Sequence, residues 1–353
     1  MLRTTAKLMR PILLVALVLT LSSTAFGAPK KIVLQIGHLN PQKPFEVATA
    51  AMTEVFKNMV EKGTNNAISV EIYPAGTLGN ERETMEQVQT GVIQSYITTG
   101  GGMAVFYPLM SILDIPFSMP SYNVAYKVYD GPFGKMLADD ILKKTGLRVL
   151  GFGESGGFFQ ITNSKRPIRT PADMKGLKFR TMTIPMHMEI MKAFGASPTP
   201  IAWAEVYTAL QTGVVDGQQN PVPIIEMGKL YEVQKYMTIT NHIYTPYVWV
   251  INNDWFTKLP KEYQEVIVDA ARTAITAGRG LNRILEASDK GLPLLSKHME
   301  IYTPTSAELE EFRKVGIAAA MSFIEKTYKD EGIRLANEYL KAIDEAKKEL
   351  GMK

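Results

Sequence analysis

Three side chains between Lys175 and Pro221 have the chemistry of an anion-binding site. Arg180 ends a short predicted strand, Trp203 leads into a predicted helix, and Asn220 follows another predicted strand. In open α/β sheets ligands bind at the carboxyl ends of strands, so we expect these side chains to lie close together. A guanidinium group can bind a carboxylate through two parallel hydrogen bonds. These residues alone predict a cationic site of the size of a carboxylate.

The elements that must position these side chains alternate between strands and helices. Proline at a first helical position and glycine after the last turn are typical helix boundaries. The expected order is a strand at 176–180, a helix between Pro185 and Gly195, a second helix at 204–212 closed by Gly213, and a short strand with a turn at 214–217 leading to Asn220.

Before this stretch the pattern predicts β-α-β-α-β, which is typical of a parallel sheet. The expected elements are strands at 32–36, 68–73 and 92–97, a helix from Pro44 to about Val60, and a helix capped by Asn80 that ends at Gly91. A mostly helical region at 121–144 and a strand at 147–152 follow. Strands at 236–240 and 247–251, a long helix at 259–285 and two amphipathic helices at 306–350, expected to form a solvated outer layer, complete the chain.

Three motifs of the central region resemble the solute-binding subunit of TRAP (tripartite ATP-independent periplasmic) transporters. They are RTMTIP at 180–185, ASPTPIAWAEVYTALQTGVVDGQQNP at 196–221 and YEVQKYMTITNH at 231–242. The resemblance covers nearly the whole chain after residue 30. It implies a periplasmic receptor that closes on a small organic acid and delivers it to a small and a large membrane subunit. It implies neither catalysis nor a cofactor or metal, and a monomer is expected.

The resemblance also implies a two-lobed α/β fold with the ligand in a cleft between the lobes. The chain is expected to cross between lobes near Gly156 and to return near Tyr244, with the helix at 259–285 spanning both. The expected division is 28–156 plus about 245–285 for lobe I, and 157–244 plus about 286–353 for lobe II.

By similarity to the family, Arg180 pairs with the ligand carboxylate, Asn220 is a neutral donor to the same group, and Trp203 packs beside the ligand. The alternative roles are a structural ion pair, a turn asparagine and a core tryptophan. The further candidate ligand contacts are Thr183, Thr99, His38 and Phe159.

Phe159 occupies a position where the sialic-acid-binding branch of the family carries a second arginine. The same branch has an acidic residue and an arginine where this chain has Thr99 and Gly102, so the cleft is expected to have lost polar partners. A monocarboxylate with an apolar or aromatic side is therefore the favoured ligand. A C4-dicarboxylate receptor of the same family is the alternative.

A different class of function is an exported serine hydrolase. Gly153-Glu154-Ser155-Gly156-Gly157 fits the G-x-S-x-G nucleophile elbow, which requires a helix directly after the serine. The following residues, 158–162, are expected to form a strand instead, so a glycine-rich crossing is the favoured interpretation. Gly100-Gly101-Gly102 lacks the lysine and Ser/Thr of a phosphate-binding loop. The four histidines show no metal-ligand spacing.

Residues 1–27 have the pattern of a signal peptide, with cleavage expected between Gly27 and Ala28. Removing the basic leader lowers the formal net charge from +4 to +1, which is too low for a nucleic-acid-binding protein. The chain has no cysteine, so stability must come from apolar burial rather than from disulfides. The sequence leaves open whether such a receptor serves transport or a signalling partner.

Overall fold

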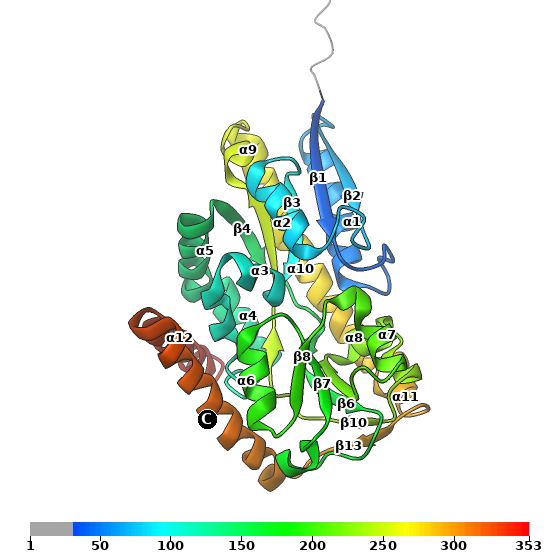
Figure 1. Ribbon diagram of the computed structural model, residues 1–353. Helices are drawn as coiled ribbons and strands as arrows, with labels where there is room; N and C mark the ends of the chain where they lie inside the picture. The colour runs from blue at the N-terminus through cyan, green and yellow to red at the C-terminus, as the bar shows by residue number, and fades with distance from the viewer. Residues whose placement is uncertain (1–30, 353) are drawn as a thin grey trace, which may run out of the picture. The chain divides into compact units, whose positions relative to one another are not determined.

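The computed structural model describes residues 31–352, so the expected signal peptide and its cleavage site lie outside the described residues. Five strands form one sheet in the spatial order β2 (Ile68–Tyr73), β1 (Ile32–His38), β3 (Ser95–Thr99), β12 (Tyr247–Asn252) and β4 (Leu147–Phe152). Strand β1 pairs in parallel with β2 and β3, whereas β12 is antiparallel to β3 and β4. This sheet and the helices packed on it are the first lobe (Figure 1).

The helices of the first lobe follow the predicted alternation with two differences. They are α1 (Ala48–Gly63), α2 (Glu81–Thr90), α3 (Gly100–Phe106), the 3-10 helix η1 (Pro108–Asp114), α4 (Tyr122–Asp130), α5 (Pro132–Thr145) and α9 (Asn253–Thr257). The helix predicted from Pro44 begins only at Ala48, because residues 43–46 form a turn and Val47 is extended. The triple glycine begins α3 rather than forming an open loop, and Thr99 caps that helix.

Six strands form the sheet of the second lobe. Their spatial order is β13 (Glu300–Tyr302), β10 (Tyr236–Thr238), β6 (Gln160–Asn163), β9 (Gly217–Asn220), β7 (Lys178–Thr181) and β8 (Ser197–Pro200). The helical segments are η2 (Pro171–Met174), α6 (Pro185–Ala193), η3 (Trp203–Glu205), α7 (Val206–Gln211), α8 (Val222–Met227), η4 (Leu230–Glu232) and α11 (Leu292–Leu295).

The strand predicted at 214–217 is displaced toward the C-terminus and runs from Gly217 to Asn220. Val214 is 57% exposed, and the amide of Val215 still bonds the preceding helix at Ala209. The Asp216 amide donates to Lys178, and the ladder with β6 begins one residue later. The shift moves the whole β9 segment into the sheet, so that Asn220 ends the strand.

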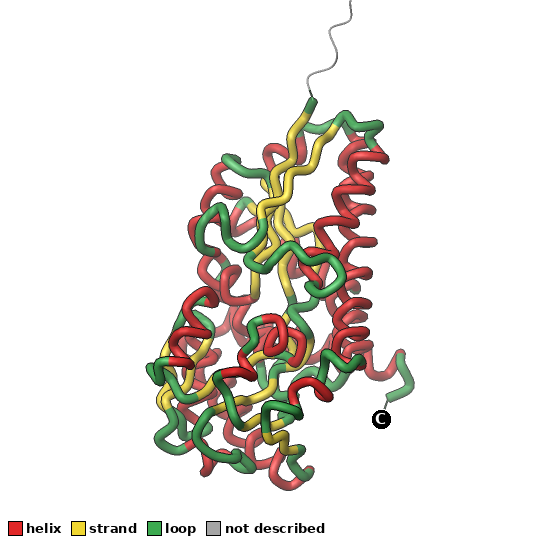
Figure 2. Tube along the Cα trace, turned by 90° about the vertical axis from the view of Figure 1, so that its right-hand side faces the viewer, coloured by secondary structure: helices red, strands yellow, loops and turns green. Residues whose placement is uncertain are grey.

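Two of the passages between the lobes pair with each other. Gly157–Phe158 (β5) and Tyr244–Thr245 (β11) form a short antiparallel ladder. Beside them runs the long helix α10, Lys261–Ala287, which packs on α1 and β4 of the first lobe and on α8 of the second. Figure 2 shows this helix extending along both lobes. The predicted two-lobed α/β fold with a spanning helix is therefore confirmed.

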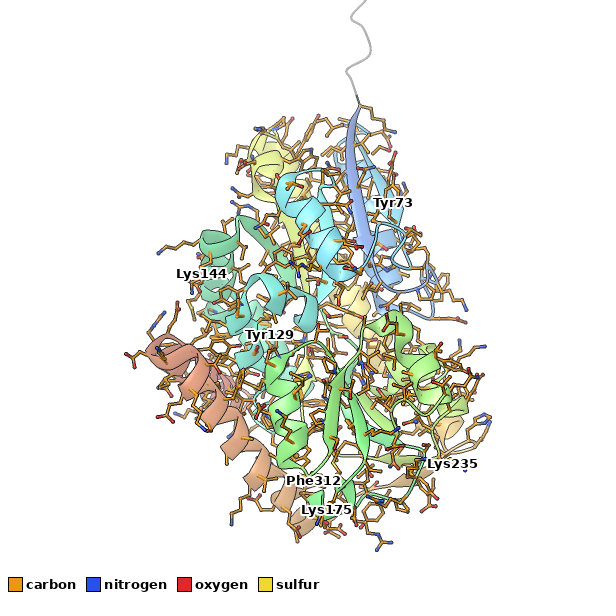
Figure 3. The ribbon with its side chains drawn as sticks, in the orientation of Figure 1. Tyr73, Tyr129, Lys144, Lys175, Lys235 and Phe312 are labelled. Carbon is orange, nitrogen blue, oxygen red and sulfur yellow. The ribbon has the colours of Figure 1, made fainter. Side chains whose placement is uncertain are left out.

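The C-terminal helix α12, Ser306–Glu349, is two helices joined at Lys329, whose backbone is non-helical. The prediction of two amphipathic helices was right, and most of their residues are exposed or partly exposed. Their assignment to the second lobe does not hold for residues after 329. Phe312 is fully buried and packs edge-to-face on Phe194 of α6, 5.1 Å between ring centroids (Figure 3). Beyond the kink, Tyr339 packs on Phe133 of α5, so residues after 329 cover the first lobe.

Apolar side chains from both lobes and from α12 form one large buried cluster. Two smaller clusters are present. One lies between the first sheet, α1 and α10, and the other between the second sheet and helices α7, α8 and α11. Within residues 31–352, no helix has the length and hydropathy needed to span a membrane.

Candidate ligand-binding site

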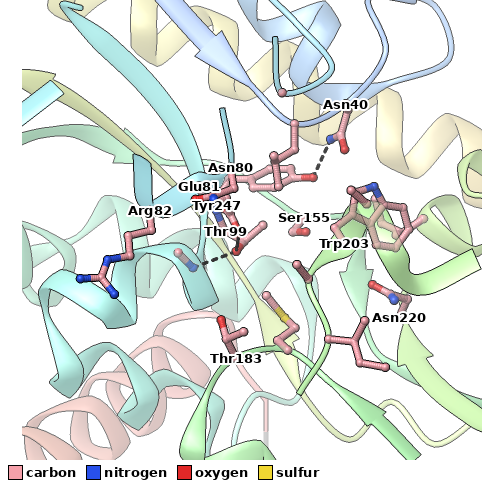
Figure 4. A pocket seen from close by; sticks show the side chains of 18 of the residues that line it. Asn40, Asn80, Glu81, Arg82, Thr99, Ser155, Thr183, Trp203, Asn220 and Tyr247 are labelled. Carbon is pink, nitrogen blue, oxygen red and sulfur yellow. Dashed lines mark hydrogen bonds between the residues drawn. The ribbon is translucent and has the colours of Figure 1, made fainter. Parts of the chain in front are cut away.

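A cavity of about 850 Å³ lies between the two lobes and takes its lining from both. The first lobe contributes loops after β1 and β2, the start of α2 and the N-terminus of α3; the second contributes the ends of β7 and β9 and the η3 segment (Figure 4). The polar or charged side chains that line it are Asn40, Asn80, Glu81, Arg82, Thr99, Ser155, Arg180, Thr183, Asn220 and Tyr247.

Arg180 lies in β7 and is only 3% exposed. Its Nε donates to the carbonyl oxygen of Ile201, 2.9 Å away, which fixes the plane of the guanidinium group. Within the described residues 31–352 the two terminal nitrogens have no hydrogen-bond partner, although the residue lines the cavity. Burial lowers the pKa of Arg180 to about 10, and the Glu81 carboxylate acts in the opposite sense, so the group is cationic at neutral pH. Two N–H donors are thus available to one carboxylate.

Asn220 ends β9, opposite Gln160 of β6. Its side-chain nitrogen donates to Gln218 Oε1 at 2.5 Å, which leaves the amide oxygen available to the cavity. Trp203, at the start of η3, also lines the cavity, and its ring lies directly against Gly228. A Cβ atom at residue 228 would lie 2.9 Å from the indole, so glycine is what leaves room for the ring.

Three further predicted residues line the cavity, and one does not. Phe159, 1% exposed, presents its ring edge-to-face to His187 and His242. Thr183 and Thr99 also belong to the lining. His38 is fully buried behind it, with Nε2 2.8 Å from Gln42 Oε1, and burial lowers its pKa to about 4. The structure therefore brings together every predicted contact except His38.

The most important side chain that the sequence did not reveal is Glu81, at the first position of α2. Its carboxylate accepts hydrogen bonds from the Thr99 amide at 2.7 Å, the Thr99 hydroxyl at 3.1 Å and the Thr98 hydroxyl at 3.0 Å. Burial raises the pKa of Glu81, while these bonds and Arg180 oppose the rise. Asn80 was predicted as the cap of this helix, but nothing in that signal indicates that the next side chain faces a ligand cavity.

The expectation that the loop at 98–103 has lost polar partners is therefore wrong in one respect, because an acid reaches the same place from another element. A Cβ atom at residue 102 would lie 2.7 Å from Glu81 Oε1, so Gly102 is what admits the carboxylate. Gly102 and Glu81 therefore depend on each other, because the carboxylate occupies space that a side chain at residue 102 would need.

The part of the lining beside the crossings is formed by Asn40, Tyr247 and Ser155. The Asn40 amide donates to the Tyr247 hydroxyl at 2.9 Å, and burial raises the pKa of that hydroxyl. The Ser155 amide donates to Thr245 across the two passages at 3.2 Å. Strand, not helix, follows Ser155, as predicted, so the geometry of a nucleophile elbow is not present there.

Charge in the cavity comes mainly from Arg180 and Glu81. Arg82 is also in the lining, but its side chain is 71% exposed, pairs with Glu86 and points away from the centre of the cavity (Figure 4). Within the described part of the chain, no cluster of three or more His, Asp or Glu side chains is placed to hold a metal ion. The site can thus pair one carboxylate with a buried cation and offer neutral and acidic groups to the remainder of a ligand.

A two-lobed α/β fold with a cationic cavity between its lobes is the architecture of a periplasmic solute receptor. Residues 38–327 match the family model of the bacterial extracellular solute-binding proteins, family 7. The chain belongs to this family, and it is a transport receptor rather than an enzyme.

Relatives with described ligands agree with this assignment. The chain is 37% identical over 219 residues to the 2,3-diketo-L-gulonate-binding periplasmic protein YiaO of Escherichia coli, covering 62% of this chain and 66% of the relative. It is 34% identical over 282 residues to the C4-dicarboxylate-binding periplasmic protein DctP of Rhodobacter capsulatus, covering 78% and 80%. A TRAP periplasmic solute-binding protein from Polaromonas sp. JS666, solved with D-erythronate, superposes with a TM-score of 0.80 at 36% identity, covering 88% and 98%.

Proposed function

We propose that this receptor binds a hydroxylated monocarboxylic acid through Arg180 and delivers it to the membrane subunits of a TRAP transporter. The observation that carries the proposal is the buried guanidinium, held by Ile201 through Nε, with both terminal nitrogens left for a ligand. A planar fork of this kind binds a carboxylate in a bidentate pair, a geometry that a lysine ammonium does not reproduce. Asn220 and Trp203 lie at neighbouring positions of the lining and are the proposed further contacts.

A single carboxylate is favoured over two. The second cation in the lining, Arg82, is largely in solvent and paired with Glu86. A second carboxylate in the cavity would instead meet the acid of Glu81 and neutral groups. A buried carboxylate without a partner is costly, and repulsion from a like charge adds to the cost.

Hydroxyl groups are favoured over an apolar remainder, which revises the ligand that the sequence favoured. That expectation rested on Phe159 and Trp203, which do line the cavity, but polar groups from both lobes surround them. Within residues 31–352 the Thr183 hydroxyl and the Asn80 side-chain nitrogen have no hydrogen-bond partner. A ligand that left such groups unpaired on closure would lose about 1–3 kcal/mol for each buried group. The relatives that bind D-erythronate and 2,3-diketo-L-gulonate support a hydroxylated acid, whereas the C4-dicarboxylate relative supports the alternative.

The family implies the remaining parts of the function. Its members are extracellular solute-binding proteins, and we propose export by cleavage near Ala28, action as a monomer, and transfer of the acid to a small and a large membrane subunit. No cofactor has a role in this proposal.

The test is a thermal-shift series with three acids of four carbons: D-erythronate, butyrate and succinate. They compare hydroxylated, apolar and doubly charged ligands of similar length. We expect D-erythronate to raise the Tm most, because at equal concentration the tightest ligand gives the largest shift. A ligand at 100 times its Kd adds ~2.7 kcal/mol to the free energy of unfolding. A larger shift with succinate would favour the dicarboxylate receptor, and a larger shift with butyrate would restore the apolar remainder.

A further inference from the structure

Glu154, in the glycine-rich first crossing, has a carboxylate that touches neither the cavity nor solvent. Its side chain is fully buried and forms a salt bridge with Arg283, one residue before the cavity-lining Ser155. The groups around it come from three segments: α10 and the return crossing, which connect the lobes, and α4 of the first lobe. A carboxylate at this position can hold the connecting segments together, and this role is separate from ligand binding.

The contacts of this carboxylate join those three segments. Arg283 of α10 places Nη2 2.6 Å from Glu154 Oε1. Tyr126 of α4 donates to Oε2 at 2.9 Å, and Tyr244 of the return crossing donates to the same oxygen at 3.4 Å. The Asn282 amide donates to the Glu154 carbonyl oxygen at 3.0 Å, so α10 holds the main chain of the crossing as well.

Two glycines follow Ser155 in the first crossing. Gly156 and Gly157 both have left-handed backbones, with φ of +81° and +101°. Arg283 also lies over the ring of Tyr122, 3.3 Å from its centroid, and pairs through Nη1 with Glu286. Loop residues that change φ and ψ are where domain closure is absorbed. Here the ion pair of Glu154 stands two residues before a pair of glycines with left-handed backbones.

We propose that the Glu154–Arg283 ion pair is a positioning device for lobe closure. It fixes the first crossing to α10 and the return crossing, so that rotation of the lobes is confined to the glycines that follow and Ser155 keeps its place in the cavity. Glu154 and Arg283 are positioning residues, and neither contacts the ligand. This inference depends on the proposed function only for its binding readout.

The matched control is the neighbouring ion pair one turn earlier on the same helix. Arg279 makes two hydrogen bonds to Asp130, at 2.6 and 2.9 Å, and a third to the Phe152 carbonyl oxygen. Asp130 ends α4 and Phe152 ends β4, so this pair lies within the first lobe and bridges no crossing. Asp130→Asn therefore removes an ion pair of the same helix, at a more exposed carboxylate, without changing a residue of either crossing.

The test measures the distance between the lobes in solution. Because the chain has no cysteine, Val92→Cys in the first lobe and Val214→Cys in the second, 65% and 57% exposed, can be spin-labelled selectively. Double electron–electron resonance is recorded without ligand for the labelled wild type, Glu154→Gln and Asp130→Asn. We expect the distance distribution of Glu154→Gln to be at least half as broad again as that of wild type, and that of Asp130→Asn to be unchanged. With D-erythronate as probe, we expect dissociation from Glu154→Gln to be at least tenfold faster while association changes less than threefold.

Arg283→Lys, which keeps the positive charge but loses the fork, is the second variant and decides the matter if Glu154→Gln does not fold. It is expected to broaden the distribution as well. An unchanged distribution in a folded Glu154→Gln or Arg283→Lys protein would overturn the proposal, as would equal broadening in Asp130→Asn. If the wild type binds none of the acids, the proposed ligand class fails, and the ligand-free distances still decide the role of the ion pair.

Discussion

Arg180 and Glu81 reach the cavity from opposite lobes, and burial disfavours the charged form of each. It lowers the pKa of the arginine and raises that of the glutamate, while each charge favours the other. An incoming carboxylate therefore has one strong partner, the buried guanidinium of Arg180.

Two buried histidines, His38 and His242, make the free energy of unfolding depend on pH. Burial lowers the pKa of His38 to about 4 and that of His242 to about 3, below the ordinary value of about 6.5. The unfolded chain therefore binds protons first as the pH falls, and the free energy of unfolding decreases from pH 6.5 downward. We expect His38→Gln to reduce the loss between pH 7 and pH 5 by roughly 1–2 kcal/mol, measured by urea denaturation at each pH.

The control for this prediction is His298→Gln, at an exposed position. It should leave the difference in unfolding free energy between pH 7 and pH 5 unchanged. A His38→Gln protein that loses as much stability as wild type over this range would show that His38 takes up its proton as readily in the folded state as in the unfolded chain.

At the scale of elements, local chemistry predicted helix ends well and strand registers poorly. Pro185 and Gly195 bracket α6 as expected, because proline and a left-handed glycine act through their own backbones. The β9 strand was misplaced because its start depends on a hydrogen bond between Asp216 and Lys178, far apart in sequence. The start of α3 at Gly100 was missed because glycine is a poor helix former, although Thr99 caps the helix; the contact with Glu81 accounts for the glycine at 102.

The kink in α12 leads to a prediction about the stability of this helix. Lys329 has φ 51° and ψ −142°, a conformation that costs a residue with a side chain about 1–3 kcal/mol. Lys329→Gly should relieve most of this strain and raise the free energy of unfolding by ~1 kcal/mol, measured by urea denaturation. Lys326→Gly, at an exposed position inside the same helix, should instead lower it by ~1 kcal/mol. Equal destabilisation by both substitutions would contradict a strained kink at Lys329.

At the scale of the whole molecule, the sequence predicted half of the site better than the other half. Arg180, Trp203 and Asn220 lie within 41 consecutive residues, so their proximity follows from one run of alternating strands and helices, β7 to β9. In the first lobe, Asn40 comes from the loop after β1 and Glu81 from the start of α2, and only tertiary packing brings these to the cavity. Relative placement of two lobes is a long-range property that no local pattern encodes.

The central claim is that this cavity binds an acid through the fork of Arg180, and calorimetry of one conservative variant tests it most directly. D-erythronate is titrated into the wild type, Arg180→Lys and Arg166→Lys, the last a matched change at an exposed arginine of the same lobe that also donates to main-chain carbonyls. A charge-assisted hydrogen bond contributes about 1.5–3 kcal/mol, so Arg180→Lys should weaken binding ~10–100-fold, while Arg166→Lys binds as wild type. A folded Arg180→Lys protein with wild-type affinity for D-erythronate would contradict the claim.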